Sequence, residues 1–467
     1  MAELAINTTS ADFSDTTYAA ARLMTLDSLA CVLGAVKSPG VPESIDMVRT
    51  WGGTPQARIL TDSGPALPLP SAVFAGGVLT HALDYDDVHV PTSMHVMSVM
   101  FPTCLSTAEW TGADGRAFLD ALTVGTEVSV RLAALTRKVQ DLAFLPTSVN
   151  GVFGAAAAVC RLTGQSVDQT VDALGLAYAQ AAGNRQALMD MTLGKRLQPA
   201  FAARDGVIAA SLSARGVTGA RRAIEGNAGL VKGYHKHDLP EDAEDILRGK
   251  QNTAPWEIEA ESVKRYCSCG SAHPMTDAAM ELATECDLHA ERIDHVEICW
   301  HGGFNPLVGM PFKLEGNPQV NAQFSSPYCV ALALLRRTGA VDRLTDEAIR
   351  ADREVADFAI NKVTMVEHVE PGPTMVERPE GWHPYTSKPQ TVIVHLKDGR
   401  TLRRDVAPAQ TFAPGRVTWD DVVEKFHQCA GFSGKLSTDA AGRVVELVST
   451  LHEQDRVDGL IDLVNGG

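Results

Sequence analysis

The strongest constraint on the fold is the helical spacing of small apolar residues through the first half of the chain. From residue 17 to residue 33, apolar side chains recur three or four positions apart, at Ala19, Leu23, Leu26, Ala30 and Leu33. That spacing predicts an amphipathic helix. Similar patterns cover residues 118–135, 151–162, 167–182 and 199–212. The first 230 or so residues therefore predict a bundle of closely packed helices with little strand.

The pattern changes in the second half of the chain. Residues 293–300, IDHVEICW, alternate apolar and polar side chains as a strand does. Residues 391–396 and 401–406 flank a turn that contains Asp398-Gly399, which predicts a hairpin. Helical spacing is expected over 322–335, 346–359 and 419–464. An extended segment is expected over 362–369. Residues 370–389 hold five prolines and predict a long loop.

Together these patterns predict a mainly α fold. A large all-helical domain is formed by both chain ends, and a smaller α+β domain is inserted between them. The expected boundaries are 1–265 for the first helical part, 266–405 for the insert and 406–467 for the C-terminal helical part.

Composition excludes several classes of function. The chain has 467 residues and a formal net charge of −16, which argues against a nucleic-acid partner. The same charge would repel an anionic substrate, so local cations must reverse the potential in its pocket. No apolar run approaches the roughly 20 residues of a membrane helix, and the N-terminus lacks a secretory pattern, so we expect a cytoplasmic protein without a membrane partner.

The cysteines point to a reducing compartment and to chemistry without an iron–sulfur cluster. Nine cysteines are scattered from Cys31 to Cys429, and no Cys-x-x-Cys occurs. Free thiols are therefore expected. Any dehydration would have to use side chains alone, and no cofactor is predicted.

The most unusual segment is HALDYDDVH at 81–89, with His95 close behind. It follows an apolar helical run over 72–83. Asp84, Asp86, Asp87 and His89 have residue types that a hard metal ion accepts, although the spacing fits neither an EF-hand nor a zinc motif. Acid–base chemistry is a second hypothesis, and a solvated acidic helix end is the third.

Two further segments carry cations. Lys195 and Arg196 precede a helix expected to begin near Pro199, where they would make a carboxylate pocket or, more simply, a surface basic pair. Residues 264–274, KRYCSCGSAHP, lie at the join of the two predicted domains. Their thiols and imidazole allow a Cys–His nucleophile or small buried thiols. Neither phosphate-binding glycine motif occurs, so nucleotide chemistry is not predicted.

These segments, in this order, resemble the MmgE/PrpD family, which includes 2-methylcitrate dehydratase, cis-aconitate decarboxylase and iminodisuccinate epimerase. The resemblance rests on HALDYDDVH at 81–89, GKRLQPAFAARDG at 194–206 and KRYCSCGSAHPMTDA at 264–278. It implies a large helical domain with an α+β lid, and a homodimer. The positions that match the family's functional residues are Asp84, His95, Lys195, Lys264, His273 and Tyr328.

The departures from the family pattern guide the functional prediction. The family often has Thr, His and His where this chain has Val88, Leu145 and Gln198. Losing two imidazoles and a hydroxyl removes groups that could protonate a leaving hydroxyl or a decarboxylated carbon. We therefore expect an epimerase that removes and returns a proton α to a carboxylate of a small anionic polycarboxylate, with iminodisuccinate as the suggested substrate.

Two alternatives remain open. One is a hydro-lyase or decarboxylase acting on a citrate-like acid, and the other is a non-catalytic polycarboxylate-binding protein. The expected acid–base pair is His95 with Lys195 or His273, and Asp84 would orient an imidazole. The predicted catalytic residues are Asp84, His95, Lys195, His273 and Tyr328. The predicted substrate-binding residues are Arg196, Lys264, Arg265, His89 and Arg185, with no metal ligand.

Overall fold

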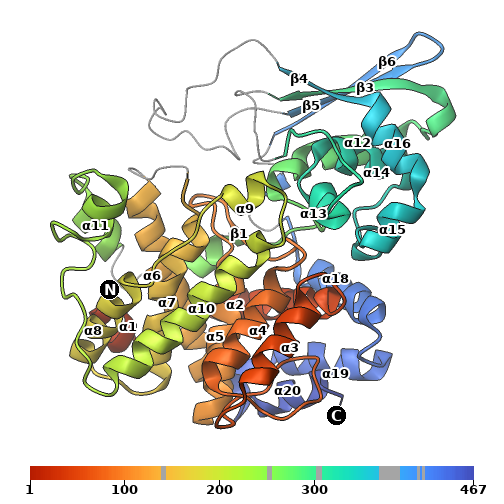
Figure 1. The fold of residues 1–467 in the computed structure, drawn as a ribbon. Helices are drawn as coiled ribbons and strands as arrows, with labels where there is room; N and C mark the ends of the chain where they lie inside the picture. The colour runs from red at the N-terminus through yellow and green to blue at the C-terminus, as the bar shows by residue number, and fades with distance from the viewer. Residues whose placement is uncertain are drawn as a thin grey trace.

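The computed structural model describes residues 1–137, 143–249, 255–300, 308–367, 390–407, 411–412 and 416–466. Within them the fold is mainly helical with a small sheet, which confirms the predicted fold class. Figure 1 shows a helical part that holds both termini, and an α+β part that lies against it and carries the sheet.

The helical part is built first from the N-terminal half of the chain. Its helices are α1 (Ala2–Asn7), α2 (Asp15–Ala35), α3 (Val41–Trp51), α4 (Leu69–His81), α5 (Met97–Thr111), α6 (Gly115–Arg137), α7 (Pro146–Leu162), α8 (Val167–Tyr178), α9 (Gln186–Met189), α10 (Gly194–Ser213) and α11 (Ala243–Arg248). Helix α7 packs between α6 and α10, and α10 packs on α4. Alanines and glycines at these contacts allow the close approach expected from the sequence: a Cβ on Gly77 would lie 2.8 Å from the Cα of Ala200.

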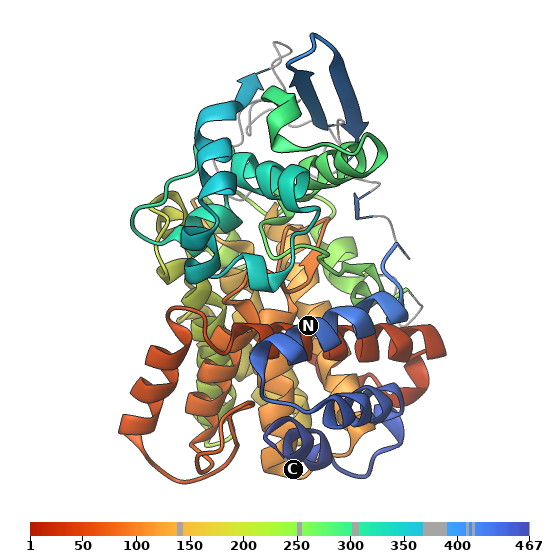
Figure 2. The ribbon, with the colours of Figure 1, turned by 90° about the vertical axis from the view of Figure 1, so that its right-hand side faces the viewer.

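The C-terminal end of the chain returns to the same helical part. Helices α18 (Trp419–Ser433) and α19 (Thr438–Ser449) both pack on α2, and α20 (Asp458–Val464) packs on α19. Figure 2 shows these blue helices beside the red N-terminal ones. The expected boundaries near residues 265 and 405 stay a prediction, as does the homodimer.

The α+β part contains a four-stranded sheet in the order β4-β3-β5-β6. Its strands are β3 (Ile293–Trp300), β4 (Val363–Glu367), β5 (Gln390–Leu396) and β6 (Thr401–Val406). Strands β3 and β4 are parallel, and the other neighbours are antiparallel. Helices α12 (His273–Glu285), α14 (Ser326–Arg336) and α16 (Arg353–Lys362) pack against the sheet. A two-residue pair, β1 (Val88–His89) with β2 (Glu261–Ser262), lies apart from it in the helical part.

The predicted hairpin is confirmed. Gly399 has a φ of +87°, which a left-handed turn position requires, and β5 pairs with β6 on either side of it. The strand over 293–300 is also confirmed, whereas the predicted loop over 370–389 lies outside the described residues.

Three helix predictions need correction. Helix α10 begins at Gly194 rather than near Pro199, so Lys195 lies in its first turn. The helix expected over 322–335 is split into α13 (Pro318–Gln323) and α14, because Pro327 cannot donate the backbone hydrogen bond that a continuous helix needs. The helix expected over 346–359 divides into α15 (Asp346–Ala351) and α16 at Asp352, whose carboxylate caps α16.

The sequence shows no apolar run of about 20 residues, yet one helix of the structure meets the length and composition of a membrane span. Among the described residues, α2 has the length and apolar composition of a spanning helix. In the structure 78% of its apolar window is buried inside the protein, as in a core helix. The cytoplasmic address stays a prediction.

Candidate functional site

The candidate site begins where helix α4 ends. After His81 the chain turns sharply, and Asp84 donates its backbone N–H to the His81 carbonyl at 3.0 Å. Asp84 has a φ of +51°, a left-handed conformation that costs most residues energy but that Asp tolerates better. This turn points the Asp84 carboxylate into the protein interior, where it is buried.

Two lysines from distant segments meet at that carboxylate. The Lys195 ammonium, in the first turn of α10, pairs with Oδ1 of Asp84, and the Lys264 ammonium lies 3.0 Å from Oδ2. Lys264 also donates to the Asp84 carbonyl at 2.7 Å. Lys264 is 0% exposed and Lys195 is 7% exposed. The two cations were predicted to converge on one site, and the structure brings them together.

Charge pairing decides the protonation states of Asp84 and Lys264. Burial alone would raise the pKa of Asp84, but Lys195 and Lys264 hold it well below its ordinary value. Burial alone would lower the pKa of Lys264, but Asp84 and Asp86 raise it above the ordinary lysine value. Asp84 is therefore an anion and Lys264 a cation at neutral pH.

His81 joins this group to a second carboxylate. Its Nδ1 lies 2.7 Å from Oδ2 of Asp86, and its Nε2 lies 2.8 Å from the Lys195 ammonium. Because an ammonium can only donate, Nε2 accepts and Nδ1–H donates to Asp86. The neutral imidazole agrees with burial, which lowers the pKa of His81 despite Asp86. We call Asp84, His81, Asp86, Lys195 and Lys264 the Asp84 cluster.

His95, which is partly buried, and His273, which is buried, are neutral imidazoles near this cluster. The His95 ring centroid lies 5.1 Å from that of His81. Burial, with Lys264, lowers the pKa of His95 to about 3. Burial, Lys264 and Arg265 hold the pKa of His273 well below its ordinary value.

The hydrogen bonds of these two imidazoles assign their tautomers. Nδ1–H of His95 donates to the Asp87 carbonyl at 2.7 Å, and Nε2–H of His273 donates to the Ser268 carbonyl at 3.3 Å. A carbonyl only accepts, so Nε2 of His95 and Nδ1 of His273 keep their lone pairs.

Arg196 is a buried cation whose hydrogen-bond partners among the described residues are neutral. Its guanidinium donates to the Pro39 carbonyl at 2.7 Å and to the side-chain oxygens of Gln319 and Gln323 at 3.2 and 3.3 Å. Burial lowers its pKa to about 10, so it remains charged at neutral pH. Among the described residues no carboxylate lies within ion-pair distance of Arg196, and a buried cation without one favours an anionic ligand.

A pocket lies beside the cluster, between α9 and the segment that leads to α13. Its volume is about 450 Å³. Methionines Met189, Met191 and Met310 line it together with Phe324. The Lys195 ammonium lies 5.2 Å from the centre of the Phe324 ring, so Phe324 both lines this pocket and lies next to the Asp84 cluster.

Four other predicted residues, His89, Arg265, Arg185 and Tyr328, make no described contact with the Asp84 cluster. His89 contacts Thr92 and Glu257, and Arg265 pairs with Asp277. Arg185 stands at the start of α9. The Tyr328 ring packs on Phe312 at 4.5 Å, and its buried hydroxyl has no hydrogen-bond partner among the described residues. Their assigned roles stay predictions.

The structure also adds residues that the sequence prediction left out. We expected Asp84 to orient an imidazole. In the structure Asp86 orients one instead, by accepting a hydrogen bond from Nδ1–H of His81. Behind the cluster, Lys425 of α18 lies 2.6 Å from Asp27 of α2 and donates to the Lys264 carbonyl at 3.1 Å. The only sequence signal for Lys425 is its place on the buried face of an amphipathic helix, where a lysine usually has a buried partner.

Burial distinguishes the three hypotheses for the acidic segment at 81–89, which were a metal site, acid–base chemistry and a solvated helix end. Asp84, Asp86 and Asp87 are buried, so the solvated acidic helix end is wrong. His81, Asp84 and Asp86 could together hold a metal ion by spacing alone, but the ion would have to displace Lys195 and Lys264 from Asp84.

In the segment 264–274, the structure disfavours a nucleophilic cysteine. Burial raises the pKa of Cys267 to about 12 and also raises that of Cys269. Both are therefore protonated at neutral pH, and a protonated thiol is a poor nucleophile.

The fold and the site define a two-part helical enzyme scaffold in which buried cations meet at one carboxylate. The chain belongs to the MmgE/PrpD family: residues 1–242 match the model of the MmgE/PrpD N-terminal domain, and residues 266–452 match the model of the C-terminal domain.

Three curated relatives illustrate the family. The chain is 26% identical to the cis-aconitate decarboxylase-like protein oryM of Aspergillus oryzae, over 96% of this chain and 92% of the relative. It is 26% identical to cis-aconitate decarboxylase of Homo sapiens, over 86% and 80% of the two chains. It is 25% identical to cis-aconitate decarboxylase of Aspergillus terreus, over 74% and 73%.

Proposed function

We propose that this protein is a cofactor-independent decarboxylase of a small polycarboxylate similar to cis-aconitate. The relatives just named are decarboxylases or decarboxylase-like, so they favour the lyase alternative over the epimerase expected from the sequence. The observation that carries the proposal is the combination of buried cations with imidazoles of low basicity.

This combination suits decarboxylation better than proton abstraction. An epimerase must first remove a proton from carbon, and a base works best when its pKa lies near the working pH. The pKa of His95, about 3, is far below that. In decarboxylation the electron pair comes instead from the breaking carbon–carbon bond, so no base is needed. Cations that stabilise the resulting charge, and one proton donor, are enough.

Charge around the cluster supports binding of a polyanion. Lys195, Lys264 and Arg196 carry three positive charges against the two carboxylates of Asp84 and Asp86. With neutral imidazoles, these five groups sum to one positive charge, inside a chain whose formal net charge is −16. In this proposal Arg196 binds a substrate carboxylate, and Lys264 lies beside the developing charge.

The proposed step balances in atoms and charge. One carboxylate leaves as carbon dioxide, and its bonding electrons pass to the substrate carbon and its neighbouring unsaturated carboxylate. A proton from the Lys195 ammonium then forms the new carbon–hydrogen bond. His81 and Asp86 hold that ammonium in place, and solvent returns the proton to Lys195 after product release.

The test follows carbon dioxide and deuterium in the same reaction. The protein is incubated in D₂O with cis-aconitate, 2-methylcitrate or iminodisuccinate in separate samples. The proposal expects carbon dioxide from cis-aconitate, with one deuterium in the product. Lys195→Ala should lower kcat/KM by about 10²- to 10⁴-fold, the usual contribution of a general acid. The exposed Lys435→Ala is the matched control and should retain activity. Absence of carbon dioxide overturns the proposal.

Iminodisuccinate epimerisation is the second candidate. It is favoured because this chain lacks three proton-donating side chains that the family often has. Val88 is buried on β1, Leu145 precedes α7, and Gln198 makes two hydrogen bonds to the backbone of Asn184, at 2.7 and 2.9 Å. Deuterium entering the iminodisuccinate stereocentre without carbon dioxide would select this candidate, whereas a new alkene from 2-methylcitrate would select a hydro-lyase.

A further inference from the structure

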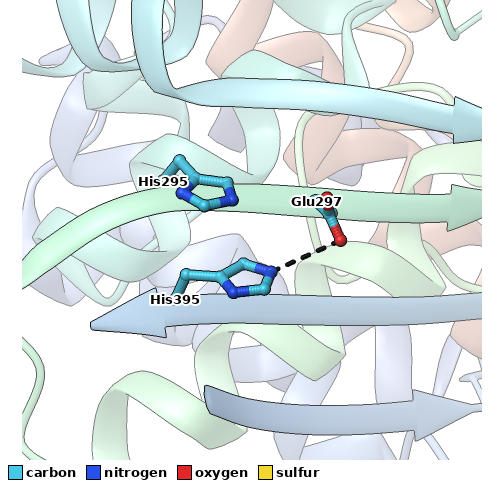
Figure 3. Close-up of side chains that lie close together, drawn as sticks. All are labelled: His295, Glu297 and His395. Atoms are coloured by element: carbon cyan, nitrogen blue, oxygen red, sulfur yellow. Dashed lines mark hydrogen bonds and ion pairs between the residues drawn. The ribbon is translucent and has the colours of Figure 1, made fainter. Parts of the chain in front are cut away.

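A second group of potential ligands lies on the sheet of the α+β part. His295 and Glu297 of β3 and His395 of β5 each offer one ligand atom, and these atoms lie within 4.8 Å of one another. His295 pairs directly opposite His395, and Glu297 lies two residues further along the same face of β3. Figure 3 shows the two imidazoles one above the other, with Glu297 to one side.

This face of the sheet is open to solvent. Val296 and Ile298, which alternate with the ligands along β3, are buried with the helices that pack on the sheet. The side chains of His295, Glu297 and His395 are 45%, 35% and 29% exposed. An ion from solution could therefore reach all three, while their strands keep the backbone positions fixed.

The spacing of two of the ligands already matches a metal site. Nε2 of His395 lies 3.3 Å from Oε2 of Glu297. Two atoms bound at about 2.0–2.1 Å to one tetrahedral zinc ion are about 3.3–3.4 Å apart. The His295 and His395 rings are stacked, with centroids 4.1 Å apart and planes 7° from parallel, so the His295 ring must turn out of this stack for its nitrogen to reach the same ion.

Outer groups orient both imidazoles for binding. Nδ1 of His295 lies 2.9 Å from Oδ2 of Asp294, and Nδ1 of His395 lies 3.5 Å from the Thr401 hydroxyl. Each ring thus has Nδ1 next to a hydrogen-bond partner and keeps Nε2 for the ion. Metal-binding histidines usually show this arrangement, with a carboxylate, carbonyl or water on the other ring nitrogen.

We propose that His295, Glu297 and His395 bind a zinc-type divalent cation. Two imidazoles and one carboxylate would supply three ligands, and water would complete a tetrahedral shell. The ion would link β3 to β5 and stabilise the sheet. The site shares no residue with the Asp84 cluster, so this proposal does not depend on the proposed decarboxylase activity.

The experiment compares zinc binding between matched variants. Chelator-treated protein is titrated with Zn²⁺ in competition with a chromophoric chelator. The wild-type protein should bind one more equivalent than His395→Ala or Glu297→Gln. Asp294→Asn keeps all three ligands and should weaken binding by about 10- to 100-fold. His289→Ala removes a half-exposed histidine that is not one of the three proposed zinc ligands. This variant should bind zinc as the wild type does.

Two further readouts keep the result specific. Cysteines and the Asp84 cluster could also take up zinc, so the measured quantity is the difference between wild type and variant. With Co²⁺ as the probe, the difference spectrum should lack thiolate charge-transfer absorption. Zn²⁺ should raise the Tm of the wild type and of His289→Ala, but not that of His395→Ala. Equal stoichiometry and affinity in wild type, His395→Ala and Glu297→Gln would overturn the proposal.

Discussion

Replacing Asp84 by Asn tests the electrostatic core of the site. Asn has nearly the same shape as Asp, and it also tolerates the left-handed conformation, here a φ of +51°. The change therefore removes the negative charge with little change in geometry. Lys264, which is 0% exposed, would lose its ion-pair partner and keep its hydrogen bond to the Asp84 carbonyl oxygen, with Asp86 as the remaining nearby carboxylate.

The size of the effect follows from burial. Breaking a buried ion pair by removing one partner costs about 3–5 kcal/mol, because a buried charge is left without its counterion. Unfolding entropy of about 2.1 cal/mol/K per residue gives about 1 kcal/mol/K for a chain of 467 residues that unfolds as one unit. We therefore expect Asp84→Asn to lower the Tm by about 3–5 °C near pH 7.

The pH dependence supplies the sharper test. The lysines hold the folded-state pKa of Asp84 well below the unfolded value of about 3.9, so its stabilisation is complete above pH 4 or so. It is lost as the pH falls through the folded-state pKa. Thermal unfolding of wild type and Asp84→Asn between pH 3 and pH 7 should show a gap that narrows on the acid side. A gap that is absent, or that does not change with pH, would refute the reasoning. Asp357→Asn, an exposed helical site, is the control.

Two more predictions concern buried groups around the cluster. Burial and Asp86 raise the pKa of Asp87 to about 7. Burial and Asp87 raise the pKa of Glu261 well above its ordinary value. The folded state therefore holds protons on these two carboxyl groups that the unfolded state releases. Unfolding free energy from urea titrations should therefore fall as the pH rises from 4 to 7, and Glu261→Gln should flatten this dependence; an unchanged profile would contradict it. Lys425→Met should cost about 3–5 kcal/mol by leaving Asp27 unpaired. Adding Asp27→Asn should recover part of that loss, and full additivity of the two changes would argue against the ion pair.

Helix and strand formation could be predicted where one periodicity is strong and local. The spacing of Leu23, Leu26 and Ala30 predicted α2, and the alternation over 293–300 predicted β3 with the observed bounds. The predictions failed at helix starts and breaks. Pro199 suggested a helix start, yet α10 begins at Gly194 and accommodates the proline inside. A proline near the first turn loses a hydrogen bond that tertiary packing can offset.

The candidate site was only partly predictable. The polar residues at 81–89 and the cations at 194–196 and 264–265 singled out three segments, and the family resemblance pointed to Asp84, Lys195 and Lys264 within them. The structure brings these three side chains together. His89 and Arg265 belong to the same segments but contact other partners. Residues one or two positions apart point in different directions, and a list of nearby polar residues cannot say which of them face each other.

The sequence by itself determined the fold class, the family motifs and the presence of cations close to an acidic segment, because these depend on local spacing and residue type. Only the tertiary structure decided that Asp84 pairs with two lysines and that Asp86 holds His81. It also decided that His95 is neutral at neutral pH. Those properties arise from burial and from contacts between residues more than a hundred positions apart, such as Asp84 and Lys195, and chain order does not encode them directly.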